Sequence, residues 1–145
     1  MRKITPAIIV SIILLFLYAC GNKPRGEELA PRNGRFIINT ASFEKGTVRF
    51  FSHHFGGKDI VFLVARSEDG GFKTAFDACI TCYPHHMGYR YEKGCVVCRY
   101  CNTAFSIENL DTGVGNCVPI KIPNKVEGGS LVISQSDVEA GSEWF

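Results

Sequence analysis

Two pairs of cysteines carry the clearest chemical signal in this sequence. They form the motifs CITC and CRYC, with 15 residues between them, at Cys79, Cys82, Cys98 and Cys101. Two-residue spacing lets both thiolates of a pair face one ion across a tight turn. Two such turns complete a tetrahedral shell of four sulfurs, each about 2.3 Å from the ion. The spacing therefore predicts a metal centre with these four cysteines as ligands.

Three other uses of the paired cysteines compete with this interpretation. Exported proteins commonly form disulfides, but a disulfide inside one CxxC unit is typical of redox-active proteins. A thioredoxin-like role is disfavoured because neither pair opens a helix after a strand. Covalent haem attachment needs His directly after the second cysteine, where Tyr83 and Asn102 stand. A metal centre is favoured, and its metal is left open between an iron–sulfur cluster and zinc.

Two further cysteines, Cys95 and Cys117, have no partner at motif spacing. Cys95 stands three residues before Cys98, which matches part of a cubane-cluster run and makes it an alternative ligand. The simpler alternatives are a Cys95–Cys117 disulfide or free thiols. Cys117 is expected close to the centre, either in a disulfide or as an additional ligand.

The segments that must position these cysteines are short and β-prone. Segments rich in Val, Ile, Thr and Phe predict strands at residues 35–39, 47–53, 60–66, 72–76, 88–91, 96–98, 104–107, 118–122 and 131–134. Asp69-Gly70 between two of these segments is a strong hairpin signal, and residues 136–141 are expected to form one closing helical turn. The fold class is therefore mostly β (small α+β), a compact antiparallel domain with the two CxxC turns between strands.

The N-terminal residues are typical of an export signal. Arg2 and Lys3 form a basic region, and residues 7–17 are apolar apart from Ser11, which suits a signal peptide and is too short for a transmembrane helix. The following LYAC resembles the lipobox of bacterial lipoproteins, which implies cleavage before Cys20 and acylation of its thiol. We expect a signal peptide over residues 1–19, a lipid-anchored flexible linker over 20–33 and the folded domain over 34–145.

Composition argues against nucleic acid and against ordinary enzyme chemistry. Without Arg2 and Lys3 the chain has 14 basic and 14 acidic residues and no basic run, so nucleic acid is not an expected partner. No nucleophile–base pair, phosphate loop or catalytic carboxylate pair stands out, which favours an electron carrier or metal-binding protein over an enzyme. The four histidines are expected to be exposed, and Asp77, Arg90 and Arg99 are expected to be surface groups.

The sequence also resembles a known family, the FtrD-like membrane iron–sulfur proteins. The likeness runs from about Thr47 to Phe145 and includes aromatic and glycine positions as well as cysteines: FDACxxCY from Phe76, Gly88-Tyr89, VVCxxC from Val96, Phe105 and Cys117-x-Pro119. It implies an extracytoplasmic iron–sulfur or related domain, associated in some members with iron transport. Many relatives carry several transmembrane helices, often have Gly at the position of Asn102, and lack Cys95.

The position of two metal-binding turns on adjacent hairpins is similar to the Rieske fold and to zinc ribbons. Rieske centres replace two thiolates by His, whereas both cysteine pairs are complete here, so this likeness concerns architecture alone.

The leading hypothesis is a lipid-anchored metalloprotein on the extracytoplasmic face of a membrane, in electron transfer or redox chemistry linked to metal transport. Its expected partners are the membrane and a membrane redox or metal-transport protein. A structural zinc site in a binding lipoprotein is the main alternative, and a thiol–disulfide or copper-thiolate protein is another.

Overall fold

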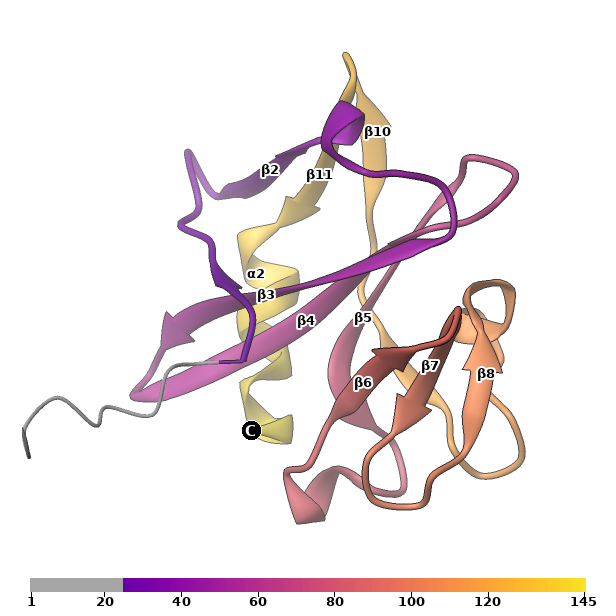
Figure 1. Cartoon of the computed structure of the whole chain (residues 1–145). Helices are drawn as coiled ribbons and strands as arrows, with labels where there is room; N and C mark the ends of the chain where they lie inside the picture. The colour runs from indigo at the N-terminus through magenta and orange to yellow at the C-terminus, as the bar shows by residue number, and fades with distance from the viewer. Residues whose placement is uncertain (1–24) are drawn as a thin grey trace, which may run out of the picture.

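The computed structural model describes residues 25–145, which form three small β-sheets and one short α-helix (Figure 1). The strands are β1 (Glu27–Glu28), β2 (Arg35–Asn39), β3 (Thr47–Phe55), β4 (Lys58–Arg66), β5 (Phe72–Cys79), β6 (Tyr89–Glu92), β7 (Cys95–Cys98), β8 (Ala104–Ser106), β9 (Pro119–Lys121), β10 (Lys125–Glu127) and β11 (Ser130–Ser134). The helix is α2 (Gln135–Ala140), and short 3₁₀ turns are η1 (Thr40–Ser42), η2 (Tyr83–His85), η3 (Ile107–Asp111) and η4 (Gly141–Trp144).

The largest sheet has the order β1-β3-β4-β5-β9, and its central strand is buried on both faces. Successive side chains of a strand point to opposite faces, so β4 serves two cores. Phe62 and Val64 belong to one core, whereas Leu63 and Ala65 belong to the other. This double burial explains the unbroken apolar run from residue 60 to 65, which lacks the alternation of a half-exposed strand.

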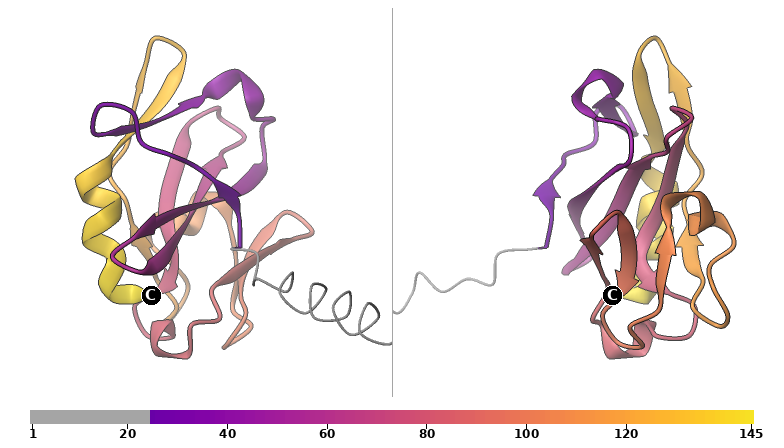
Figure 2. Two further views of the ribbon diagram at one scale, coloured as in Figure 1. Left: turned by 90° about the vertical axis from the view of Figure 1, so that its left-hand side faces the viewer. Right: turned by 45° about the vertical axis from the view of Figure 1, so that its right-hand side comes forward.

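The sheet β10-β11-β2 and helix α2 close the first core. Phe36 and Ile38 point inward from β2, where exposed and buried residues alternate, and Leu131 and Ile133 point inward from β11. Figure 2 shows this sheet and α2 on the side of the molecule away from the smallest sheet. This part of the domain is a conventional hydrophobic core and contains no cysteine.

The smallest sheet, β6-β7-β8, packs over the second core. Its inward side chains include Tyr89, Val96 and Phe105, which meet Leu63 of β4. The register pairs Tyr89 with Cys98 and Glu92 with Cys95, so the last residue of β7 lies beside the first residue of β6. Buried cysteines Cys79, Cys82, Cys98 and Cys117 belong to this core, which therefore positions the candidate centre.

The observed architecture confirms the expected fold class: strands predominate, nearly all pairings are antiparallel, and the closing helix is short. Two strands were not predicted. β1 and β10 span two and three exposed residues, too short to show an apolar pattern. Their pairing comes from their neighbours, since β1 runs parallel to β3 and β10 completes a hairpin with β11.

Within the range 20–33, where we expected a flexible linker, the described residues include a short paired strand. Glu27 and Glu28 pair with Phe51 and Ser52, the amide of Leu29 donates to the carbonyl of Ser52, and Leu29 packs against the first core. A polar segment can pair through its backbone without a buried face of its own. The domain thus starts before residue 34. The predicted signal peptide and Cys20 lie outside the described residues.

Among residues 25–145, no helix is both long enough and apolar enough to span a membrane.

Substitution of Leu63 tests whether the second core contributes to the stability of the fold. The side chain is fully buried between β4 and the small sheet, so Leu63→Ala is expected to lower the free energy of unfolding by about 2–5 kcal/mol. Val126→Ala is the matched control, because Val126 is 55% exposed on a three-residue edge strand, and a loss below about 1 kcal/mol is expected there. Guanidinium chloride unfolding measures both; equal losses would contradict this assignment of the core.

Candidate metal centre

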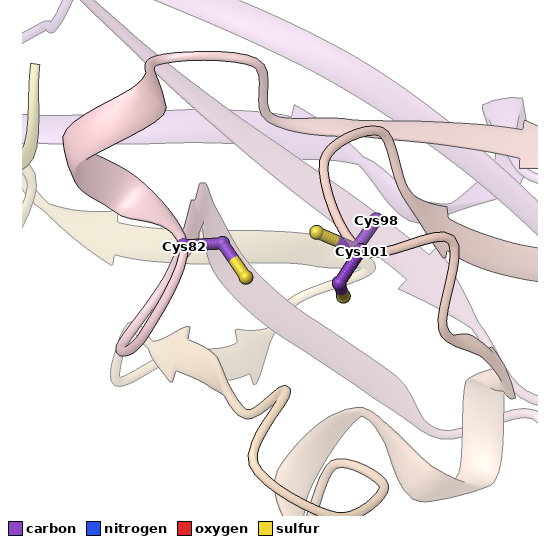
Figure 3. Close-up of side chains that lie close together, drawn as sticks. All are labelled: Cys82, Cys98 and Cys101. Carbon is purple, nitrogen blue, oxygen red and sulfur yellow. The ribbon is translucent and has the colours of Figure 1, made fainter.

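Three cysteine sulfurs converge at one end of the small sheet. The Sγ atoms of Cys82, Cys98 and Cys101 all lie within 4.8 Å of one another. Figure 3 shows the Cys82 thiol projecting from the turn after β5 toward the loop that carries Cys98 and Cys101. The structure thus brings together members of both CxxC pairs. Four sulfurs bound to one tetrahedral ion at about 2.3 Å lie about 3.8 Å apart, so the observed separations are close to those of a thiolate site.

The first CxxC turn continues directly from β5. Cys79 is the last residue of that strand, and the amide of Ile80 donates to the carbonyl of Val118 at 3.0 Å. The hydroxyl of Thr81 donates to the carbonyl of Asn116 at 2.7 Å, which fixes the middle of the turn. Cys82 then caps η2, whose first turn contains Pro84. These bonds explain why the two sulfurs of this pair point into the domain.

The second CxxC turn continues from β7. The amide of Asn102 donates to the carbonyl of Cys98 at 2.9 Å, and the amide of Cys98 donates to the carbonyl of Thr103 at 3.0 Å. Asn102 has φ 58°, a left-handed conformation that Asn tolerates better than most residues. The amide of Arg99 donates to the carbonyl of Gly88 at 2.9 Å. This bond links the second CxxC turn to the segment that follows the first CxxC turn.

Cys117 lies beside the first pair, whereas Cys95 lies away from the group. β9 pairs with the end of β5, with Cys79 opposite Pro119, and this brings Cys117 to the first turn. Cys117 is 3% exposed and belongs to the same buried core as Cys79. Cys95 starts β7, three residues and about 10 Å from Cys98. Both thiols are free, and the structure holds no Cys95–Cys117 disulfide among its described residues.

The protonation of the thiols differs between cysteines of the same pair. Burial raises the pKa of Cys79, but hydrogen bonds from the backbone of Cys82 and Thr81 outweigh it, and the pKa ends below its usual value. Burial also opposes ionisation of Cys101, yet hydrogen bonds from Thr103 lower its pKa to about 6. Burial raises the pKa values of Cys82 and Cys117, with the neighbouring thiols adding to the shift. A metal that binds this set must displace protons from the buried thiols.

Tyr89 is a residue of the site that the cysteine spacing alone does not reveal. Its ring is buried, and its hydroxyl has no well-formed hydrogen bond among the described residues. Burial raises its pKa, and the neighbouring charges of Cys79, Cys117 and Cys98 raise it further. Tyr89 also lines a small cavity together with Cys79, Cys82 and Cys98. A buried donor without an acceptor costs about 1–3 kcal/mol. An electron-rich sulfur centre would supply that acceptor, so the orphaned hydroxyl fits a group bound there.

Asp77 is buried beside the site and is not the surface group that we expected. It is 3% exposed, and Oδ1 accepts a hydrogen bond from the amide of Tyr89. Burial raises the pKa of Asp77 to about 7, although the Tyr89 amide and the charges of Arg25 and Arg99 oppose the shift. Arg25 Nη2 lies 3.7 Å from Oδ2 and donates to the carbonyl of His86. One carboxylate thus links the N-terminal segment to the chain between the two cysteine pairs.

The rim of the centre is aromatic and apolar. The rings of His85 and Tyr100, one from each side of the site, stack with centroids 3.6 Å apart and planes 9° apart. Ile80, Met87 and Tyr100 are among the large hydrophobic residues that remain exposed. His85 and His86 are exposed, as expected, whereas His53 is partly buried. His53 and His54 contact different acids, Glu139 and Asp59, so they form no joint metal site.

A family model confirms the resemblance noted from the motifs. The model described as "Membrane iron-sulfur containing protein FtrD-like" matches residues 43–145, which include both cysteine pairs and Cys117. The chain belongs to the FtrD-like family. Membership of a family described as iron–sulfur, together with the cluster of cysteine sulfurs, suggests metal binding at this site.

Other comparisons are more distant from this FtrD-like protein. No curated protein matches it. Among solved structures it is similar to the quaternary ammonium Rieske monooxygenase CntA, crystallised with an inhibitor, at a TM-score of 0.47 and 11% identity. The similarity covers 77% of this chain and 32% of the monooxygenase chain, so the FtrD-like protein spans about a third of that length.

Gly88 tests how closely Asp77 must approach the chain between the cysteine pairs. It has φ +64°, and a Cβ there would lie 2.3 Å from Asp77 Oδ2. Gly94 has φ +81° with nothing within 4 Å of its Cβ position. Gly94→Ala is therefore expected to cost about 1–2 kcal/mol for its conformation alone, and Gly88→Ala about 1–3 kcal/mol more for the clash.

Chemical unfolding of the two glycine variants under reducing conditions measures this difference. The Gly88→Ala protein is also expected to bind less metal than the Gly94→Ala protein, because the displaced carboxylate lies beside Tyr89 and the second turn. Equal unfolding free energies would contradict the tight packing of Asp77 against Gly88.

Proposed function

We propose that this FtrD-like protein is an extracytoplasmic, lipid-anchored electron carrier with an iron–sulfur centre bound by Cys79, Cys82, Cys98 and Cys101. The observation that carries the proposal is the convergence of sulfurs from both CxxC pairs, within 4.8 Å, in the core of a domain whose family is described as iron–sulfur. An all-sulfur donor set favours iron–sulfur clusters, zinc and Cu(I) over metals that prefer oxygen ligands. An iron–sulfur centre, when bound, supplies one-electron chemistry.

The protein residues have separate roles in this proposal. Buried Cys79, Cys82 and Cys98 hold their sulfurs away from water, and only Cys101 of the four is exposed. Tyr89 offers a hydroxyl hydrogen to sulfur from within the core, which stabilises negative charge there and raises the reduction potential of such a centre. The stacked rings of His85 and Tyr100 limit access of water from the outside.

The exposed rim supports transfer to a protein partner at the membrane. Residues 78–91, 95–105 and 112–118 contain no Asp or Glu and include Arg90 and Arg99. The exposed side chains of Ile80, Met87 and Tyr100 near the most exposed ligand suit brief docking to a membrane redox or metal-transport protein. Electron-transfer contacts of this kind are typically small and transient.

A structural zinc site is the second candidate, and one observation favours it. The sulfurs of Cys82, Cys98 and Cys101 are close enough together to share one ion. Zinc would stabilise the junction of the two turns without redox chemistry.

Metal analysis of the full chain, purified anaerobically in detergent, distinguishes these candidates. Iron with acid-labile sulfide and a visible spectrum that bleaches on reduction is the expected result; one zinc per chain and no colour would select the structural site. Cys82→Ser and Cys98→Ser are expected to lose the metal, because each removes a buried ligand. Cys95→Ser is the matched control and is expected to keep it, since Cys95 starts β7 outside the group. A metal content of the Cys98→Ser protein equal to that of the wild type would contradict the proposed ligand set.

The lipid anchor is tested at Cys20, in the LYAC sequence that resembles a lipobox. The wild-type chain is expected to sediment with membranes and to carry a mass increase on the peptide that begins at Cys20. Cys20→Ala is expected to remove both features while leaving the metal content unchanged, because the cluster residues lie in the domain. Membrane recovery of the variant equal to that of the wild type would refute lipid anchoring through this residue.

A further inference from the structure

The segment that follows α2 also reaches the candidate metal centre. Trp144 and Phe145 line the same small cavity as Cys79, Cys82 and Cys98, and this cavity has a volume of about 20 Å³. A space of that size holds about one water molecule. Residues from the two CxxC turns and from the end of the domain, which are far apart in the sequence, therefore enclose one small space beside the sulfurs.

The contact between this segment and the first CxxC turn is aromatic. The ring of Trp144 meets the ring of Tyr83 edge to face, with centroids 4.8 Å apart and planes 86° apart. Aromatic pairs prefer this arrangement because the positive edge of one ring faces the negative face of the other. In both views of Figure 2 the chain after α2 lies close to the turn that follows β5. Since Tyr83 directly follows Cys82 and begins η2, Trp144 packs on the neighbour of a proposed ligand.

The first core holds this segment in place. Val138 of α2 is fully buried there, and Gly141 packs on Phe76 so closely that a Cβ at Gly141 would lie 2.1 Å from the ring. The rings of Phe145 and Phe76 have centroids 6.2 Å apart. Phe76 belongs to β5, the strand that ends at Cys79. The strand that carries the first proposed ligand thus also supports the segment that encloses the cavity.

A second aromatic pair of the same geometry differs from Trp144 in its location. Phe72 packs edge to face on Phe43, with centroids 5.6 Å apart and planes 89° apart, and both Phe72 and Trp144 are partly buried against the first core. Phe72 begins β5 whereas Cys79 ends it, so about 23 Å of strand separates them. Of the two, Trp144 lines the cavity with the cysteines and Phe72 does not. An effect on the centre that is specific to Trp144 therefore cannot result from the loss of an aromatic contact as such.

We propose that Trp144 is a positioning residue of the centre: it holds Tyr83, and through it Cys82, and it closes the cavity beside the sulfurs to solvent. The inference rests on the proposed metal-binding function and deepens it. Solvent and reagents reach the buried thiols of the cavity when the contact between Trp144 and Tyr83 opens, a local event that costs less free energy than global unfolding. Because Trp144 belongs to a segment anchored in the first core, the rate of metal exchange depends on packing outside the cysteine turns.

Metal release from the loaded full chain tests this role. Trp144→Ala is expected to lose its metal to excess EDTA about two- to tenfold faster than the wild type, the factor that corresponds to one aromatic pair. Trp144→Phe keeps a ring at this position and is expected to stay within about twofold of the wild type. Phe72→Ala is the matched control and is also expected to stay within about twofold, because it is distant from the cavity. Equal rates for Trp144→Ala and the wild type, or the same acceleration in Phe72→Ala, would overturn the proposal.

Alkylation of the metal-free, reduced full chain gives a readout that does not depend on bound metal. Iodoacetamide is expected to modify Cys79 and Cys82 about two- to tenfold faster in Trp144→Ala than in the wild type, as measured by peptide mass analysis. Cys101 is exposed and does not line the cavity, so its rate of modification is expected to stay the same. A uniform acceleration of all three thiols would indicate general loosening of the fold and would contradict a specific role of Trp144.

Fluorescence of the wild-type chain tests the contact even if a variant fails to fold. All tryptophan emission comes from Trp144, because the chain has one tryptophan. The cavity has no room for a carbamidomethyl group, so modification of Cys82 is expected to displace Trp144 and to shift its emission to longer wavelength. Unchanged emission after complete modification of Cys82 would overturn the contact. A chain that binds no metal would instead refute the proposed function, which the alkylation and fluorescence results do not test.

Discussion

The site depends on one geometric constraint: the end of β5 must lie beside the end of β7. Cys79 ends one strand and Cys98 ends the other, and both CxxC turns begin where backbone pairing stops. The two strands belong to different sheets, so no backbone ladder holds them together. What holds them is the second core, in which Leu63 of β4 and Val96 of β7 are fully buried. The stabilisation from hydrophobic packing grows with the apolar area that is removed from water. Packing in the second core thus sets the distance between the two CxxC turns.

Asp77 adds a polar connection across the same junction. Its carboxylate accepts from the amide of Tyr89, contacts Gly88 and lies 3.7 Å from Arg25. Burying a carboxylate opposes its ionisation, which is why its pKa rises to about 7 despite the nearby cation. Such a group is costly unless its partners are fixed. The turn after β5, the start of β6 and the segment at Arg25 are therefore positioned together.

Much of the fold and the core of the candidate site could be predicted from the sequence because their signals are local. CxxC spacing is a property of one tight turn, and β2 shows its buried face in five residues. β1 and β10 could not be predicted, since pairing of two or three exposed residues depends on a distant partner. The burial of Asp77 could not be predicted, because it results from the packing of other elements on both faces of β5. The approach of Cys117 to the first pair depends likewise on the pairing of β9 with β5.

The cysteines of the cluster differ in their exposure to solvent. Three motif cysteines and Cys117 are buried in the second core, while Cys101, whose sulfur lies near those of Cys82 and Cys98, is exposed and donates to the hydroxyl of Thr103. A buried sulfur is protected from water but is also far from any partner. An exposed cysteine such as Cys101 is accessible to both. In the proposed electron transfer, contact with another molecule would involve the Cys101 side, where Ile80, Met87 and Tyr100 are exposed.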